Sequence, residues 1–238
     1  MPREAQALTG IRELSDLHTC SRYNLFRTTR AFRAGFQDWF GFECLNRPFD
    51  SIYYRQDDVN PTEINAYQTD GLTDLAIDYF KNYEGEEPLF LVLSVEPPHF
   101  PLQVPDEWKR FDPDTLQVRL NFSEQPNGGC DLASYYAMIE NLGWSINRLM
   151  ETLENIPEFK DSLTVYFSDH GEFMGSHNYF NRKAPHEDSV RIPAIFHWPE
   201  GIPAQGNIDG LFSLVDLLPT TLGLIGADIP EYIQGTDF

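Results

Sequence analysis

Apolar residues recur along this chain with two different periods. The helical period predicts a helix near 70–83, a longer one over about 132–154, and a third at 213–226 that Pro219 kinks or breaks. Three apolar runs, at 89–95, 162–168 and 192–198, have the length and continuity of strands covered on both faces. Strands that alternate with helices indicate an α/β fold, with a mostly parallel sheet between layers of helix.

Two stretches lack either period. Residues 1–34 are basic and contain five arginines between Arg12 and Arg33, and the aromatic-rich stretch that begins at Gly35 resembles loop more than strand. We expect a surface-packed irregular segment here, and a long covering loop over 99–131. As domains, the sequence predicts an atypical N-terminal segment, 1–34, and one catalytic α/β domain, 35–238.

Composition narrows the possible functions. The 238 residues are 41% apolar, which is enough for one substantial core, and the formal charge of −20 makes nucleic acid an improbable partner. No apolar run has membrane-spanning length, and the N-terminus has no signal-peptide core, so we expect a cytoplasmic protein by default. Three scattered cysteines without a CxxC spacing do not support a zinc cluster. The oligomeric state is left open.

The sequence Asp169-His170-Gly171 follows directly on the strand predicted at 162–168. A carboxylate beside an imidazole suits a divalent cation that accepts oxygen and nitrogen donors, although a strand-end aspartate is also a common helix N-cap. In α/β sheets, ligands bind beyond the carboxyl ends of the strands. We therefore expect Asp169 and His170 at the end of a central parallel strand, with His99 on a neighbouring loop of the same cleft.

Two further residues are candidates for anion chemistry. His99 lies in a proline-stiffened loop, "EPPHFP", and could donate to an oxyanion or leaving group; packing is the alternative. Lys183 carries a compact charge suited to a sulfate or phosphate oxygen, or is a solvated surface lysine. Asp57-Asp58 is interpreted as turn chemistry. His177 could line the same pocket or cap a turn.

Several long segments resemble the sulfatase family, in the family's order. "FLVLSVEPPHFPLQVPDEW" resembles the strand and Pro-His-x-Pro-Leu loop of that family. "YYAMIENLGWSINRLMETLE" is similar to its long helix, and "SLTVYFSDHGEFMGSHNYFNRKAPHEDSVRIPAIFHWP" to its second metal-binding segment. "SLVDLLPTTLGLIGADIPEYIQGTDF" resembles the helix and loop that follow. The resemblance runs from about Gly35 to Phe238.

This resemblance implies an alkaline-phosphatase-like α/β fold and hydrolysis of small or saccharide sulfate esters by a formylglycine made from Cys or Ser. It implies a divalent metal, usually calcium, with manganese or magnesium as alternatives. Carried over to this chain, Asp169 and His170 become metal ligands. His99 and Lys183 become catalytic and substrate-binding contacts to the sulfate and the leaving oxygen.

The chain departs from the family pattern at the nucleophile. It contains no Cys/Ser-x-Pro-x-Arg, no strand-borne Asp-Asp and no Gly-Lys-x-His. "MPREAQALTG" could be the tail of the nucleophile motif, although Glu4 stands where arginine is expected. We expect an incomplete catalytic domain, without the C-terminal subdomain and inactive by itself. The alternatives are a phosphate or phosphonate ester hydrolase of the same superfamily, and a degenerate protein that binds anions or a partner.

Overall fold

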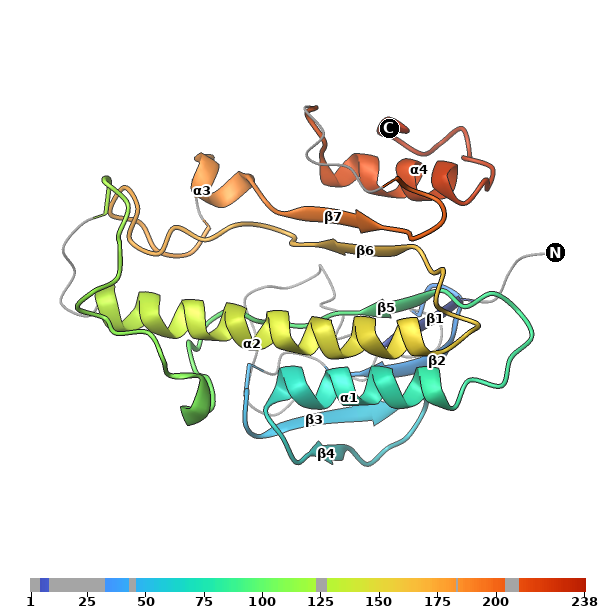
Figure 1. Ribbon diagram of the computed structural model, residues 1–238, viewed down its shortest axis with the longest axis horizontal. Coiled ribbons are helices and arrows are strands. Elements are labelled where there is room, and N and C mark those ends of the chain that lie inside the picture. Colours follow the sequence, from blue (N-terminus) through green and yellow to red (C-terminus); the bar gives the residue numbers. More distant parts are fainter. Residues whose placement is uncertain (1–4, 9–32, 43–45, 123–127, 183, 204–209) are drawn as a thin grey trace. The chain divides into compact units, whose positions relative to one another are not determined.

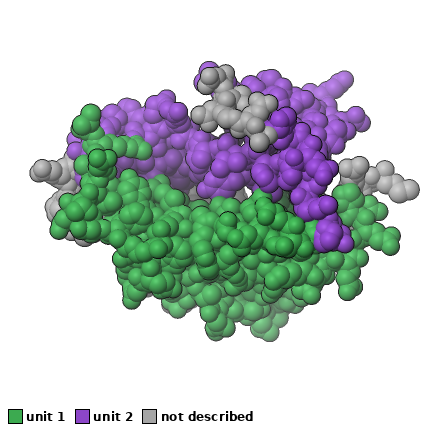
Figure 2. Space-filling view, in the orientation of Figure 1, with its two compact units in different colours: residues 1–120, 124–156 green, residues 121–123, 157–238 purple. Residues whose placement is uncertain are grey.

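The computed structural model describes residues 5–8, 33–42, 46–122, 128–182, 184–203 and 210–238 (Figure 1). The chain divides into two compact units, which are coloured separately in Figure 2. The first unit is residues 1–120 with 124–156, and the second is residues 121–123 with 157–238. Among the described residues, no helix is both long and apolar enough to cross a membrane.

A five-stranded mixed sheet forms the first unit, in the order β4-β3-β2-β1-β5. Its strands are β1 (Ala5–Leu8), β2 (Phe36–Gly41), β3 (Ser51–Arg55), β4 (Thr62–Ile64) and β5 (Leu91–Leu93). β1 is parallel to both β2 and β5, whereas β2–β3 and β3–β4 are antiparallel. The antiparallel pairs follow from connections too short for the crossover that parallel strands require. The α/β class is confirmed, and among the described strands parallel pairing is confined to β1 and its two neighbours.

The prediction of irregular structure after Gly35 was wrong. This stretch supplies β2, β3 and β4, which make up most of the sheet. In β2 the burial alternates along the strand, and Trp39 and Phe42 are almost fully buried. Aromatic residues have high strand propensity, and here they pack on a half-buried pleated surface. Pro48, Asp50 and Pro61 lie in the connections between these strands, whereas Asp38 and Gly41 lie inside β2 and hid its strand pattern.

The predicted helices of the first unit are confirmed, with small shifts at their ends. They are α1 (Gln68–Lys81) and α2 (Gly128–Asn155), and a short 3₁₀ turn, η2 (Asp106–Trp108), lies in the long loop between them. α1 packs on α2 through a polar contact, because Asp70 accepts hydrogen bonds from Asn141 Nδ2 (2.9 Å) and Ser145 Oγ (3.1 Å). Both donor side chains are fully buried and have no access to water, so the Asp70 carboxylate is the acceptor that satisfies them.

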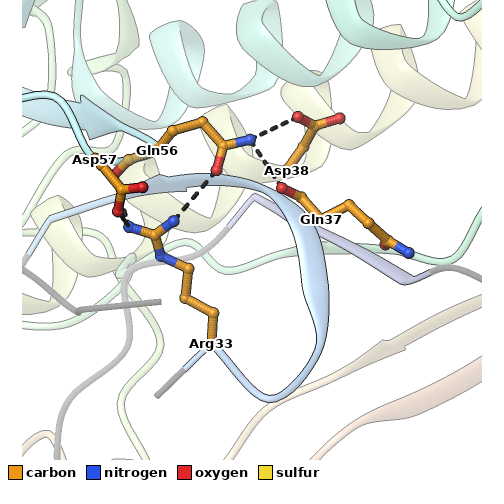
Figure 3. A network of polar contacts seen from close by, with 5 residues as sticks. All are labelled: Arg33, Gln37, Asp38, Gln56 and Asp57. Carbon is orange, nitrogen blue, oxygen red and sulfur yellow. Dashed lines mark hydrogen bonds and ion pairs between the residues drawn. The ribbon is translucent and has the colours of Figure 1, made fainter. Parts of the chain in front are cut away.

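A polar network fixes the turn after β3 (Figure 3). The guanidinium of the buried Arg33 donates to the Gln56 carbonyl (2.7 Å) and to the Asp57 carboxylate (2.8 Å). The Gln56 amide in turn donates to Asp38 Oδ1 (2.7 Å), and Tyr79 donates to Asp38 Oδ2 (2.8 Å). Gln56 has a left-handed φ of 50°, which this network holds. The interpretation of Asp57 as a turn residue is confirmed.

The second unit contains a two-stranded sheet and two helices. β6 (Thr164–Phe167) pairs with β7 (Ala194–His197) in antiparallel register, and the helices are α3 (Glu187–Val190) and α4 (Leu214–Leu224). The prediction that β6 is a central parallel strand was wrong for the pairings described. The connection from β6 to β7 contains only the four-residue α3, so it has no crossover helix to return the chain in parallel.

Candidate functional site

The chain bends at Asp169 directly after β6, and we call the segment Asp169-His170-Gly171 the candidate ligand turn. Ser168 Oγ donates to the His170 carbonyl (2.8 Å), and the Gly171 amide donates to the Ser189 carbonyl in α3 (2.8 Å). A Cβ at residue 171 would overlap the Asp188 carbonyl oxygen and lie 3.0 Å from its carbon. Only glycine therefore allows this close backbone contact, which holds the turn on α3.

Within the turn, hydrogen bonding sets the His170 tautomer. Nδ1 lies 2.8 Å from the Gly171 carbonyl, which can only accept, so Nδ1 carries the proton. The lone pair of the neutral ring is then on Nε2, and Nε2 lies 3.5 Å from Asp169 Oδ2. Two ligand atoms that each lie about 2.4 Å from a cation, at an angle of about 90°, are about 3.4 Å apart. Asp169 Oδ2 and His170 Nε2 therefore have the separation of two neighbouring metal ligands.

These two side chains do not make a metal site by themselves. The Asp169 side chain is 80% exposed, and the described residues contain no group of three His, Cys, Asp or Glu side chains placed to hold an ion. A hard cation such as calcium takes six or more oxygen donors. The pair therefore fits as one part of a coordination sphere that needs further oxygen donors.

A second cluster lies in the loop that follows the turn. The rings of His177 and His186 stack at 4.7 Å, and His177 Nε2 lies 3.6 Å from the carboxylate of Asp188. Asn121 Nδ2 contacts the same ring nitrogen at 3.0 Å, and Phe173 packs edge-on against His186. Sequence analysis missed Asp188. The cluster ties the loop to α3, the same helix that holds the candidate ligand turn.

His99, in the first unit, is also held in one tautomer. Its Nδ1 lies 2.6 Å from the Phe100 carbonyl, so Nδ1 donates and Nε2 is the nitrogen that can meet a substrate. The Asn46 amide group satisfies its neighbours best when its NH₂ donates to the Glu96 carboxylate, at 3.0 and 3.1 Å. The amide oxygen of Asn46 then faces His99 Nδ1 at 3.4 Å. These contacts fix the ring within its loop.

A small pocket opens beside this histidine. The start of α1 contributes Tyr67, Gln68 and Thr69 to its wall, and the His99 loop contributes Glu96. Gln68 Nε2 is buried and makes no hydrogen bond to any described residue. Burial raises the pKa of Tyr67 to about 12. The sequence did not indicate a pocket at these residues, because they begin a helix whose pattern of apolar residues is that of any amphipathic helix.

Comparison with known proteins identifies the family. The sequence profile described as Sulfatase matches residues 17–227. The chain belongs to the sulfatase family. It is 28% identical over 231 residues to the ulvan-active sulfatase of Formosa agariphila, covering 93% of this chain and 44% of that protein. It is 28% identical over 198 residues to the arylsulfatase of Clostridium perfringens, covering 73% of this chain and 41% of the relative.

The fold agrees with that of solved sulfatases. The sulfatase yidJ from Bacteroides fragilis superposes with a TM-score of 0.85 at 23% identity, over 99% of this chain and 55% of that structure. The alkaline-phosphatase-like fold expected from the sequence is therefore confirmed. This chain spans less than half the length of the two curated relatives named above.

The residues predicted for the site fall in different parts of the chain. Asp169 and His170 adjoin each other in the second unit, whereas His99 belongs to the first. Lys183 lies outside the described residues. A shared cleft between His99 and the ligand pair, and the position of the 34/35 domain boundary, stay predictions.

Proposed function

We propose that this chain contributes part of a sulfate-ester hydrolase site, as a member of the sulfuric ester hydrolases. The observation that carries the proposal is the turn after β6, where Asp169 Oδ2 and His170 Nε2 converge to 3.5 Å. The contact of Gly171 with α3 holds that turn before any ligand arrives. Such preorganisation reduces the cost of assembling a charged site.

Asp169 and His170 would be two ligands of a divalent cation, calcium first, with manganese and magnesium as alternatives. Calcium favours the carboxylate oxygen, and the imidazole nitrogen widens the choice toward manganese. When bound, the metal would stabilise negative charge on the ester oxygens. His170 would contribute through Nε2, because Nδ1 is committed to the Gly171 carbonyl.

His99 and Lys183 would act on the substrate. With its Nδ1 proton held by the Phe100 carbonyl, His99 can present a protonated Nε2 and donate to the oxygen that leaves sulfur. The Lys183 ammonium would bind a sulfate oxygen as a point charge. A positioned acid of this kind contributes about 10²–10⁴-fold to rate.

The nucleophile is the missing part of this arrangement. No Cys/Ser-x-Pro-x-Arg motif occurs in the 238 residues, so the sequence offers no site for the formylglycine that the family uses. His99 and Lys183 can stabilise charge, but enzymes accelerate reactions by about 10⁶-fold or more. The 238 residues by themselves should therefore not turn over a sulfate ester.

We infer a saccharide sulfate as the substrate class of the whole site. The support is the names of the relatives, which include an ulvan-active sulfatase and an N-acetylglucosamine-6-O-sulfatase. A phosphonate ester is the second candidate, because the phosphonate monoester hydrolase of Silicibacter pomeroyi shares the fold at a TM-score of 0.63. The relatives favour the sulfate ester.

Two assays test the proposal. The purified chain, with calcium, should hydrolyse a chromogenic aryl sulfate no faster than its His99→Ala/Asp169→Ala variant. Faster turnover would mean that another nucleophile operates. Joined to a nucleophile-bearing segment of a longer sulfatase, the chain should gain turnover that His99→Ala lowers by about 10²-fold or more. His197→Ala, on β7, is the matched control, and an aryl phosphonate substrate separates the two candidate activities. Turnover that His99→Ala leaves unchanged would refute the catalytic role of His99.

A further inference from the structure

The Nδ1 side of the His99 ring faces a backbone carbonyl and a side-chain amide. Nδ1 lies 2.6 Å from the Phe100 carbonyl oxygen and 3.4 Å from the amide group of Asn46. The carbonyl can only accept, so Nδ1 carries a proton and cannot accept a hydrogen bond from Asn46. The oxygen of the Asn46 amide, and not its NH₂, therefore faces the ring. At 3.4 Å this oxygen is the longer arm of a shared hydrogen bond.

The Glu96 carboxylate requires the same orientation of Asn46. With its NH₂ turned away from His99, Asn46 donates to Glu96 Oε1 at 3.0 Å and to Oε2 at 3.1 Å. The opposite orientation would place the amide oxygen against a carboxylate that only accepts. Two separate neighbours thus require one orientation of the amide. The result is a chain of carboxylate, amide and imidazole, in which the charge of Glu96 polarises the Asn46 amide toward the ring.

Backbone hydrogen bonds hold the members of this chain in place. Glu96 and His99 belong to one loop, in which the His99 amide donates to the Glu96 carbonyl (3.0 Å). The segment that carries Asn46 is tied to the start of α1, because the Gln68 amide donates to the Pro48 carbonyl (2.7 Å). Asn46 itself is exposed, so water competes for its hydrogen bonds. Its effect should therefore fall on the orientation of the His99 ring more than on the stability of the fold.

We propose that Asn46 and Glu96 are positioning residues of the sulfate-ester site, which keep the Nε2 nitrogen of His99 available to the leaving oxygen. This role rests on the proposed function, in which His99 is the acid. There the protonated ring gives its Nε2 proton to the leaving oxygen, which keeps the electron pair of the broken S–O bond. The ring is then neutral and retains its proton on Nδ1, the nitrogen that the Phe100 and Asn46 oxygens face. The contacts therefore favour the tautomer that the reaction leaves behind.

The tautomer of His99 can be measured in the full 238-residue chain without any turnover. Nitrogen-15 NMR of the neutral imidazole distinguishes a proton on Nδ1 from one on Nε2. The parent chain should show His99 in the Nδ1–H form alone. In Asn46→Ala and in Glu96→Ala the ring should populate both forms, because it is no longer held by the Asn46 oxygen. Glu96→Gln should keep the Nδ1–H form, since a glutamine oxygen can still accept from Asn46.

An asparagine elsewhere in the first unit provides the matched control. Asn147, exposed on α2, also donates to a glutamate, Glu151 Oε1, at 2.7 Å. Asn147→Ala should leave the His99 signals unchanged. A parent chain with His99 in the Nε2–H form, or an Asn46→Ala chain that keeps the Nδ1–H form alone, would overturn the proposal.

Turnover tests the same role in the chain joined to the nucleophile-bearing segment of a longer sulfatase. Asn46→Ala should lower kcat about tenfold or more and leave KM nearly unchanged, since a misplaced acid is felt in the transition state. An unchanged kcat in Asn46→Ala, where His99→Ala lowers it, would overturn the proposal. If His99→Ala also leaves turnover unchanged, the proposed function of His99 fails. Mixed tautomers in Asn46→Ala would then still show that Asn46 positions the ring.

Discussion

Adding one methyl group at Gly171 should loosen the candidate ligand turn. The new Cβ would overlap the carbonyl oxygen of Asp188, and a backbone atom cannot move aside as a side chain can. Overpacking of this kind costs about 1–3 kcal/mol, and loss of the 2.8 Å bond from the Gly171 amide to Ser189 adds about 1 kcal/mol. The sum, about 2–4 kcal/mol, should lower the melting temperature of Gly171→Ala by about 5–10 °C.

Gly143→Ala gives a control of opposite sign. A Cβ at residue 143 meets nothing within 4 Å, and the residue lies inside α2, where alanine is favoured over glycine by about 0.5–1 kcal/mol. Circular dichroism should therefore show a small rise in melting temperature for Gly143→Ala and a large fall for Gly171→Ala. Amide exchange at residue 171 should accelerate in the second variant. A Gly171→Ala chain as stable as the parent would refute the close contact with α3.

Three further outcomes follow from the structure. Asp70→Ala leaves Asn141 and Ser145 without their buried acceptor, so the free energy of unfolding in urea should fall by about 2–3 kcal/mol; an unchanged value would contradict the α1–α2 contact. The Tyr67 pKa is about 12 in the folded chain and near 10 in an unfolded chain. The contribution of neutral Tyr67 to the free energy of unfolding is therefore complete below pH 10 and is lost as the pH rises toward 12. Tyr67→Phe should make the alkaline fall shallower, and an identical fall would argue against burial as the cause. Millimolar calcium should stabilise the isolated chain by about 0.4 kcal/mol, the value for a ligand at its dissociation constant. A large thermal shift that Asp169→Ala removes would reveal a complete metal site.

The long helices were predictable because their apolar residues keep one period over several turns. α1 and α2 were placed to within a few residues, and the strands at β6 and β7 were found from their unbroken apolar runs. The strands β2, β3 and β4 were missed. Each has only three to six residues, which is too few to show a clear alternation of apolar and polar side chains in a segment that also contains Gly, Asp and Pro. Their identity depends on pairing with other strands, which the pattern within each short segment does not contain.

The candidate site also has a part that the sequence predicts and a part that it does not. Asp169 and His170 were predictable from their place at a strand end, and Gly171 from the turn it permits. The contacts that hold the turn come from Asp188 and Ser189, which the sequence separates from it by seventeen or more residues in an unremarkable acidic stretch. A backbone carbonyl leaves no signature in a sequence, so the partner of Gly171 could be known only from the fold.

The ligand pair of the second unit limits how tightly the described residues can hold a cation. At the turn, Asp169 and His170 provide two donors where a hard cation takes six or more, and the carboxylate is 80% exposed. Water would fill the remaining positions of a cation held by this pair alone, so the calcium affinity of the pair should be low.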